Sequence, residues 1–422
     1  MSIQTFSSPS FLATSNIYEV NIRQYTAEGT FNAFAKHIPR LKDMGVQILW
    51  LMPIYPIGLL NRKGTLGSYY SISDFEDVNP EFGTKTDFEN LVKTAHENGL
   101  KVILDWVANH TAWDHVWTKT NPDFFENDEQ GNFKPPFDWE DVIQINHSNI
   151  YQQLAMIDAM KYWVTNFDID GFRADMAHLI PLQFWIDARA AITPLKNDLI
   201  WLAETEDIPY AQAFDITYTW EWMHASEDMC KQQVSLKETV NILEKYKNNF
   251  PANHYRLFYT SNHDENSWVA TEYEKYGAFT KAMAIFSCMY KSVPLIYSGQ
   301  ELPNYKRLKF FDKDEIDWNE NVELHHFYKT LYDVRKKYTT LFENPVIKLD
   351  EDSLNFNLLC YSIKNDSHEL YVCLNFRGEN TNFVLKNIYG NYKNVFTDEI
   401  LRIENELLFT TTTGGYLVLE KL

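Results

Sequence analysis

The chain repeats one pattern over most of its length, in which a short apolar segment precedes an amphipathic segment with helical spacing. Repeated strand–helix units favour parallel strands, and eight of them in about 340 residues suit a closed barrel. The predicted fold class is therefore α/β, a (β/α)8 TIM barrel. The eight expected strands lie in IYEVNIRQY (17–25), VQILWLMPIYP (46–56), KVILDWVANH (101–110), DIDGFRAD (168–175), LIWLAET (199–205), AFDITY (213–218), RLFYTSNHD (256–264) and VPLIYSG (293–299).

Two segments depart from this pattern. Residues 107–147 are polar, aromatic and without helical spacing, which predicts a short subdomain inserted after the third strand. From about residue 344, short strands alternate with turn residues, which predicts a C-terminal antiparallel β-sandwich with strands in 356–363, 369–376, 382–388 and 414–422. The expected domains are thus the barrel (1–106 and 148–343), the inserted subdomain (107–147) and the sandwich (344–422).

The net charge of −20 and the pI near 5.0 disfavour polyanionic partners. We therefore expect neither nucleic acid nor an anionic membrane as a partner. Aromatic residues make up 15% of the chain, and many lie in polar segments such as NHTAWDHVWTKTNPDFF (109–125). Flat amphipathic side chains in such segments suit uncharged ligands with apolar faces, sugars among them.

Residues 1–16 have no basic start and no continuous apolar run, so they do not predict a secretory signal. No stretch has the length of a membrane span. The expected location is the cytoplasm, or a secreted or periplasmic one if a leader has been removed. The sequence leaves the oligomeric state open.

The four cysteines have no metal-ligand spacing, and no metal site is predicted from them. The spacing of Cys360 and Cys373 would let them face each other across a hairpin that turns near 365–367. Small buried thiols are the commoner arrangement, so we expect two separate thiols.

The stretch FDIDGFRAD (167–175) begins as a buried strand and ends with charged residues. Side chains alternate across a strand, so Arg173 and Asp175 are expected to project to the same side. A buried cation and a buried carboxylate are costly unless a site uses them. This pair is the first indication of a functional site.

Polar residues follow other expected strands as well, and the carboxyl ends of barrel strands carry the chemistry in this fold. Taken singly, Asp175 is explained by an ion pair, Glu204 by a helix cap and His263 by a structural hydrogen bond. Their joint position on separate strands predicts a shared site instead. It comprises Asp105, Asn109 and His110 after the third strand, Arg173 and Asp175 at the fourth, Glu204 at the fifth, and His263 and Asp264 after the seventh.

Paired carboxylates around an uncharged, ring-stacking ligand indicate cleavage of a glycosidic bond, which needs one protonated acid and one ionised carboxylate. We expect Arg173 to lower the pKa of Asp175 and keep it anionic. Glu204 has no cation near it in the sequence, so we expect it to stay protonated and to donate.

Four motifs in order resemble the α-amylase family of glycoside hydrolases (family 13), over almost the whole chain: DWVANH (105–110), GFRAD (171–175), the glutamate of LAETE (202–206) and TSNHDE (260–265). The segments ANHTAWD, SNHDENSW and PLIYSGQE are similar to those of bacterial members. The resemblance implies a retaining hydrolase that cleaves α-glucosidic bonds, of the α-1,4 type, in starch-like α-glucans or maltooligosaccharides.

The resemblance also implies roles for single residues. The catalytic residues would be Asp175 as nucleophile, Glu204 as acid and base, and Asp264 as stabiliser of the transition state. The substrate-binding residues would be Arg173, which positions the nucleophile, His110 and His263, which bind the reacting sugar, Tyr70, on which that sugar stacks, and Asp105, which supports the site. Tyr69 is adjacent to Tyr70, so the stacking residue stays open by one position.

The chain departs from the family pattern at three places. Many members bind a structural calcium through an asparagine, which Asn109 matches, and through an aspartate. In this chain Gln144 stands where that aspartate is expected. We expect no cofactor to be required, and calcium remains an open alternative. Met176, His178 and Leu179 follow the nucleophile where other residues are usual, which leaves the type of bond and the chain length open.

Other interpretations remain at this point. A metal-dependent hydrolase is one, although the first strand lacks paired histidines; a non-catalytic sugar-binding barrel is another. An α-glucosidase or a transglycosylase of the same family would use the same residues. Five tryptophans near loops at the barrel mouth are candidates for further sugar stacking or for packing: Trp113, Trp117, Trp220, Trp222 and Trp268.

Overall fold

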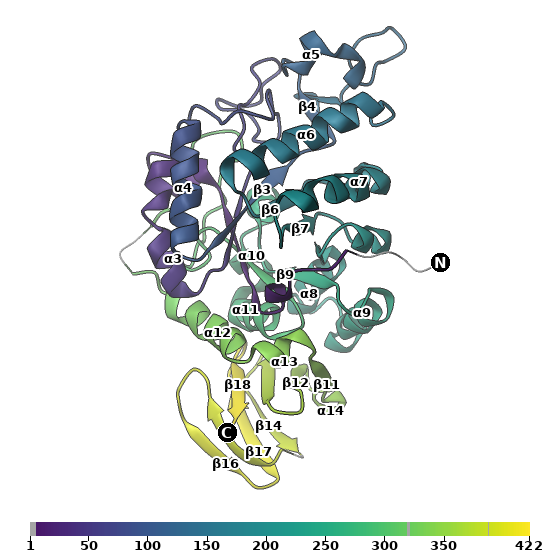
Figure 1. The fold of residues 1–422 in the computed structure, drawn as a ribbon. Coiled ribbons are helices and arrows are strands. Elements are labelled where there is room, and N and C mark those ends of the chain that lie inside the picture. Colours follow the sequence, from purple (N-terminus) through teal and green to yellow (C-terminus); the bar gives the residue numbers. More distant parts are fainter. Residues whose placement is uncertain (1–5, 319–320, 387) are drawn as a thin grey trace.

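The computed structural model describes residues 6–318, 321–386 and 388–422 and contains a closed barrel of eight parallel strands (Figure 1). The predicted (β/α)8 barrel is confirmed, with a strand in each of the eight expected segments. In the order of the closed sheet the strands are β1 (Ile17–Val20), β2 (Ile48–Leu51), β3 (Lys101–Trp106), β6 (Gly171–Ala174), β7 (Ile200–Ala203), β8 (Ile216–Thr217), β9 (Tyr255–Tyr259) and β10 (Val293–Tyr297).

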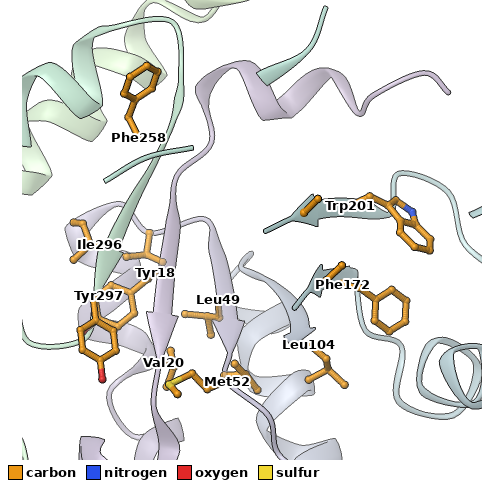
Figure 2. Close-up of a cluster of buried hydrophobic side chains, with 14 of the residues drawn as sticks. Tyr18, Val20, Leu49, Met52, Leu104, Phe172, Trp201, Phe258, Ile296 and Tyr297 are labelled. Carbon is orange, nitrogen blue, oxygen red and sulfur yellow. The ribbon is translucent and has the colours of Figure 1, made fainter. Parts of the chain in front are cut away.

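Alternating side chains give the barrel two apolar layers. Outward residues such as Leu49, Phe172 and Trp201 pack between the strands and the surrounding helices (Figure 2). Inward residues such as Ile48 and Leu202 fill the barrel interior. Because these inward side chains fill the interior, the barrel is a packed core rather than a pore. Burial of each such side chain contributes about 1.5–3 kcal/mol to the stability of the fold.

Helices surround the barrel, and several have the capping residues that favour a helix start. Thr84 and Ser235 form capping boxes with the third residue of α4 and α9, which satisfies otherwise unpaired backbone N–H groups. None of the helices in the described part of the chain combines the length and apolar character that a membrane crossing requires. The helices are α1 (Ile22–Tyr25), α2 (Phe31–Ala35), α3 (Ile38–Met44), α4 (Lys85–Glu97), α6 (Ile150–Phe167), α7 (Leu182–Ile192), α8 (Trp220–Cys230), α9 (Leu236–Asn249), α10 (Glu272–Tyr276), α11 (Thr280–Met289), α12 (His325–Lys337) and α13 (Thr339–Glu343).

The segment between β3 and α6 lies beyond one end of the barrel (Figure 1). It contains the antiparallel pair β4 (His110–Ala112) and β5 (Val142–Gln144) and the short helix α5 (Trp117–Thr120). This pairing brings Gln144 opposite His110 and so places the inserted segment over the end of β3.

The C-terminal part is antiparallel and lies at the opposite end of the molecule (Figure 1). It has a six-stranded sheet and a two-stranded sheet, which pack on each other around a separate apolar cluster. The strands are β11 (Val346–Leu349), β12 (Leu358–Lys364), β13 (Glu369–Asn375), β14 (Thr381–Lys386), β15 (Gly390–Asn394), β16 (Ile400–Ile403), β17 (Glu406–Thr411) and β18 (Tyr416–Lys421), with helix α14 (Glu351–Leu354) after β11.

The expectation of two separate thiols in this part was wrong. The register of β12 and β13 places Cys360 directly opposite Cys373, and the two form a disulfide. Cys230 and Cys288 are free and buried.

Candidate active site

A pocket of about 620 Å³ opens at the carboxyl ends of the barrel strands. Side chains from the loops after β2, β3, β6, β7, β9 and β10 meet there, so segments far apart in the sequence share one cavity. The residues that line it are Lys63, Ser68, Tyr70, His110, Asp138, Trp139, Asp141, Val142, Asp175, Met176, Glu204, His263, Asp264, Trp268, Phe310 and Phe311. Six of the eight predicted site residues line this cavity, and Arg173 and Asp105 lie buried beneath them.

The guanidinium of Arg173 is fully buried and contacts three carboxylates. Its Nη1 donates to Asp175 Oδ1 at 3.1 Å and to Asp105 Oδ1 at 2.8 Å. Its Nη2 lies 2.7 Å from Glu204 Oε2, as an ion-pair contact without hydrogen-bond alignment. Glu204 has no cation near it in the sequence, but β7 lies beside β6 and brings Glu204 to the same arginine.

The pKa of Asp175 also differs from the expectation. Burial raises the pKa of Asp175 well above its usual range, and the opposing effect of Arg173 does not compensate because Glu204 and Asp105 add negative charge. Burial likewise raises the pKa of Glu204, although the positive charge of Arg173 acts to lower it. Because one cation serves three acids, the protons belong to the cluster rather than to one residue.

Met176 connects the two carboxylates through the backbone. Its φ of 41° lies in the left-handed region, which is uncommon for a residue with a side chain. In this conformation its N–H donates to Glu204 Oε2 at 2.8 Å. The strained turn after Asp175 thus holds Glu204 in place.

Asp105 is fully buried and bridges the floor of the pocket. Besides Arg173, it accepts hydrogen bonds from Tyr70 Oη at 3.0 Å and from Trp50 Nε1 at 3.1 Å. The same tryptophan lies 4.8 Å beneath the guanidinium of Arg173. These contacts fix the arginine from below, so it cannot turn away from Asp175.

His263 is held between a carboxylate on each side. Its Nδ1 lies 2.5 Å from Glu19 Oε1, and its Nε2 lies 3.2 Å from Asp264 Oδ2 and 2.7 Å from Tyr70 Oη. Burial lowers the pKa of His263, but Asp264 and Glu19 outweigh it and raise the pKa to about 9. Burial also raises the pKa of Glu19, and since Asp264 adds a second negative charge we assign the proton to the imidazole.

Glu19 was missed by the sequence reasoning. It lies on β1 opposite Trp50 of β2 and is fully buried. A carboxylate within the apolar strand IYEV was the available signal, since a charge inside a barrel strand is unfavourable without a partner.

His110 lies at the other side of the pocket, and burial lowers its pKa to about 4. The ring is therefore neutral at neutral pH and suits hydrogen bonding rather than charge stabilisation. Asn109 Nδ2 contacts its Nδ1 at 3.2 Å.

The position expected for calcium holds two neutral amides. Gln144 Nε2 donates to Asn109 Oδ1 at 3.1 Å and to the backbone oxygen of Asn109 at 3.0 Å. A cation would need these oxygens to face it, but an N–H group already occupies them. The residues present do not fit a calcium site at this position. Among the residues that the structure describes, no group of three or more His, Cys, Asp or Glu side chains is arranged to hold a metal ion.

Aromatic rings form one wall of the pocket. Tyr70 lines it, whereas Tyr69 packs against the guanidinium of Arg23 below. Phe310 lies parallel to Tyr70, with ring centroids 6.2 Å apart and planes at 12°. Trp268, 51% exposed, continues this row beside Phe310.

The other candidate tryptophans have different environments. Trp222 is buried and stacks on Phe286 in the core. Trp117 packs on Phe75, Trp113 donates to the backbone oxygen of Glu140, and Trp220 packs edge-on against His178.

The barrel and its pocket place the protein among the (β/α)8 proteins, with buried carboxylates and an aromatic wall at the carboxyl ends of the strands. The model of the alpha-amylase catalytic domain matches residues 9–147 and 137–329 of the chain. The chain belongs to the alpha-amylase family, as the sequence motifs predicted.

Three relatives illustrate this membership. The alpha-amylase from Lactobacillus plantarum is 29% identical, with a TM-score of 0.89 over 98% of this chain and 100% of that chain. The maltogenic alpha-amylase AmyB from Thermotoga neapolitana is 34% identical, with a TM-score of 0.88 over 97% of this chain and 99% of that chain. Alpha-amylase MalA from Haloarcula japonica is 26% identical over 89% of this chain, which spans 57% of MalA.

Proposed function

We propose that the protein is a retaining glycoside hydrolase that cleaves α-1,4-glucosidic bonds in starch-like α-glucans or maltooligosaccharides. The observation that carries this proposal is the single buried guanidinium of Arg173, which contacts both Asp175 and Glu204 in one pocket. Relatives described as an alpha-amylase and as a maltogenic alpha-amylase support the choice of substrate.

In the first step Asp175 attacks the anomeric carbon, and the bond to the leaving oxygen breaks as Glu204 protonates that oxygen. Arg173 gives Asp175 an aligned hydrogen bond and Glu204 an unaligned contact. This step needs an ionised Asp175 and a protonated Glu204, and the aligned hydrogen bond from Arg173 favours the ionised form of Asp175 against the effect of burial. The product of this step is a glycosyl group bound to Asp175.

In the second step Glu204 removes a proton from water, and the water oxygen displaces the carboxylate of Asp175. Asp264 and the charged His263 lie on one side of the sugar, and neutral His110 lies on the other. Tyr70 supplies the stacking surface below the ring. Two successive inversions leave the anomeric configuration unchanged.

The proposal is tested with purified protein and maltooligosaccharides. We expect hydrolysis products whose first-formed anomer, followed by proton NMR, is α; a β product would contradict the retaining mechanism. Products longer than the substrate would indicate transfer to sugar acceptors, which uses the same intermediate and would replace hydrolysis as the conclusion. No turnover of any α-glucan or α-glucoside would refute the proposal.

The acid role is tested separately with Glu204→Gln. Activity should fall strongly on maltooligosaccharides and least on substrates whose leaving group needs no proton. Glu206→Gln is the matched control, because Glu206 is the next acidic residue along the chain but pairs with Arg256 outside the pocket. An equal loss on all leaving groups would contradict the role of Glu204.

A further inference from the structure

Residues 58–67, here called the strap, cross one side of the pocket and are fixed at both ends. At the first end Gly58 lies so close to Ala112 of β4 that any side chain would overlap it. The backbone N–H of Leu59 donates to Asp114 Oδ2 at 2.8 Å. The strap is thereby joined to the inserted segment.

The second end of the strap is joined to the segment after β10. The N–H and the hydroxyl of Thr65 both donate to Asp312 Oδ1, at 2.9 and 2.6 Å. The N–H of Leu66 donates to the backbone oxygen of Phe311 at 3.0 Å. Gly64 has a φ of 63° and faces Phe311 without space for a side chain. A segment fixed at both ends in this way forms a wall rather than a mobile loop.

The order of the barrel strands places the strap opposite Glu204. Glu204 follows β7, which lies four strands from β1 in either direction around the barrel. The strap follows β2 and its partner segment follows β10, the two neighbours of β1. If Glu204 protonates the leaving group, as proposed above, the retained sugar chain runs away from Glu204 and toward the strap.

An ion pair joins the strap to the inserted segment within the pocket. Lys63 of the strap and Asp141 of the inserted segment both line the pocket, with Nζ and Oδ1 2.8 Å apart and side chains 40% and 9% exposed. The ammonium of Lys63 can donate and the carboxylate of Asp141 can accept hydrogen bonds, so the pair suits two adjacent hydroxyls of a terminal sugar. Phe310 extends the stacking surface beside Tyr70 in the same pocket.

We propose that the strap closes the glycone side of the pocket after no more than two glucose units, and that Lys63 and Asp141 bind the hydroxyls of the non-reducing end. The enzyme would then release glucose or maltose from chain ends rather than cleave inside a chain. This inference rests on the proposed function.

The test compares maltoheptaose with a derivative whose non-reducing end carries a 4,6-ethylidene group, with products followed by chromatography. We expect the blocked substrate to react at least about 100-fold more slowly, because a site built to bind hydroxyls rejects an analogue without them. Equal rates, or maltotriose with maltotetraose as initial products in place of glucose with maltohexaose or maltose with maltopentaose, would overturn the inference. Absence of turnover with both substrates would refute the proposed function, and the inference with it.

Two variants locate the effect at the strap. Lys63→Ala should raise the ratio of blocked to unblocked rates at least about tenfold and raise KM for maltoheptaose. Lys134→Ala is the matched control, since Lys134 forms a 2.8 Å ion pair with Glu126 in the same inserted segment but outside the pocket. Equal changes in both variants would overturn the role of Lys63, and urea unfolding of each variant verifies that it folds.

Discussion

Strand β6 has an aspartate just beyond each end, and the fold treats the two differently. Asp170 precedes the strand at the amino end of the barrel and has several partners of its own. Its Oδ2 contacts His96 Nε2 at 2.7 Å and accepts from the N–H of Val102 at 2.8 Å. Lys196 and Lys101 lie 3.0 and 3.3 Å from its Oδ1.

Asp175 follows the strand at the carboxyl end, where one arginine serves three acids. Although burial raises the pKa of Asp170, hydrogen bonding by His96 and the lysines outweigh it and lower the pKa to about 2. The pKa of Asp175 moves the other way, because burial outweighs its share of Arg173. This barrel therefore stabilises the charge of Asp170 at its amino end and leaves the charge of Asp175 under-compensated at the end where chemistry is proposed.

The largest expected effect is at the carboxyl end. Asp175→Asn should lower kcat at least about 10⁴-fold, since removal of a nucleophile costs rates of that order. Because the pKa of Asp175 is raised in the folded state, ionised Asp175 destabilises the fold as the pH rises. At pH 7 the neutral Asp175→Asn variant should therefore unfold at a urea concentration equal to or higher than that of the wild type. Wild-type turnover, with deamidation excluded by mass spectrometry, would remove Asp175 from the mechanism.

The next effect is at the amino end. Asp170→Asn should lower the free energy of unfolding by about 2 kcal/mol at pH 7, because the pKa falls from 3.8 to about 2 on folding. The contribution of Asp170 is complete above pH 4 and is lost as the pH falls toward 2, so the two proteins should converge in acid. Urea unfolding across this range measures the difference.

The control for this variant is Asp168→Asn, which removes a neighbouring carboxylate that pairs with Lys196 but is 70% exposed. Its effect should stay near zero, as for most surface ion pairs. Activity of Asp170→Asn should equal that of the wild type; a loss of kcat would contradict the division between the two ends.

A smaller effect is expected at Glu19, which acts on the site through His263. Glu19→Gln should lower the pKa of His263 below about 9 and reduce kcat/KM about tenfold at pH 8, because the imidazole loses one of its two anionic partners. NMR titration of the imidazole, assigned with His263→Asn, checks the direction. An unchanged pKa would show that Asp264 alone holds the proton.

The smallest effect concerns calcium. Dialysis against EDTA should change the unfolding midpoint by less than about 1 °C, because the amide of Gln144 occupies the oxygens of Asn109. Thermal unfolding with EDTA and with added calcium measures this. A calcium-dependent rise would mean that Gln144 turns aside to admit a cation.

The barrel was predictable because each strand is a short apolar run with a polar residue at its end, as in LIWLAET. In the C-terminal part, β11, β15, β16 and β17 were missed because their exposed faces interrupt the apolar pattern. The site residues within motifs were predicted together, and the structure gathers them in and beneath one pocket.

The contacts between strands were not predictable from the sequence. Arg173 and Glu204 lie 31 positions apart and meet only because β6 and β7 are neighbours in the closed sheet. The pair of Lys63 and Asp141 likewise depends on how the inserted segment folds back over the pocket. The direction of a pKa shift depends on burial as well as on nearby charge, and the burial of Asp175 could not be predicted from the motif alone.

Asn109 and Gln144 lie near the two ends of the inserted segment, and their hydrogen bonds close its base with uncharged groups. Hydrogen bonds between uncharged groups are insensitive to ionic strength, whereas attraction between exposed charges weakens once dissolved ions screen it. The base of the inserted segment should therefore stay closed equally in dilute buffer and in concentrated brine.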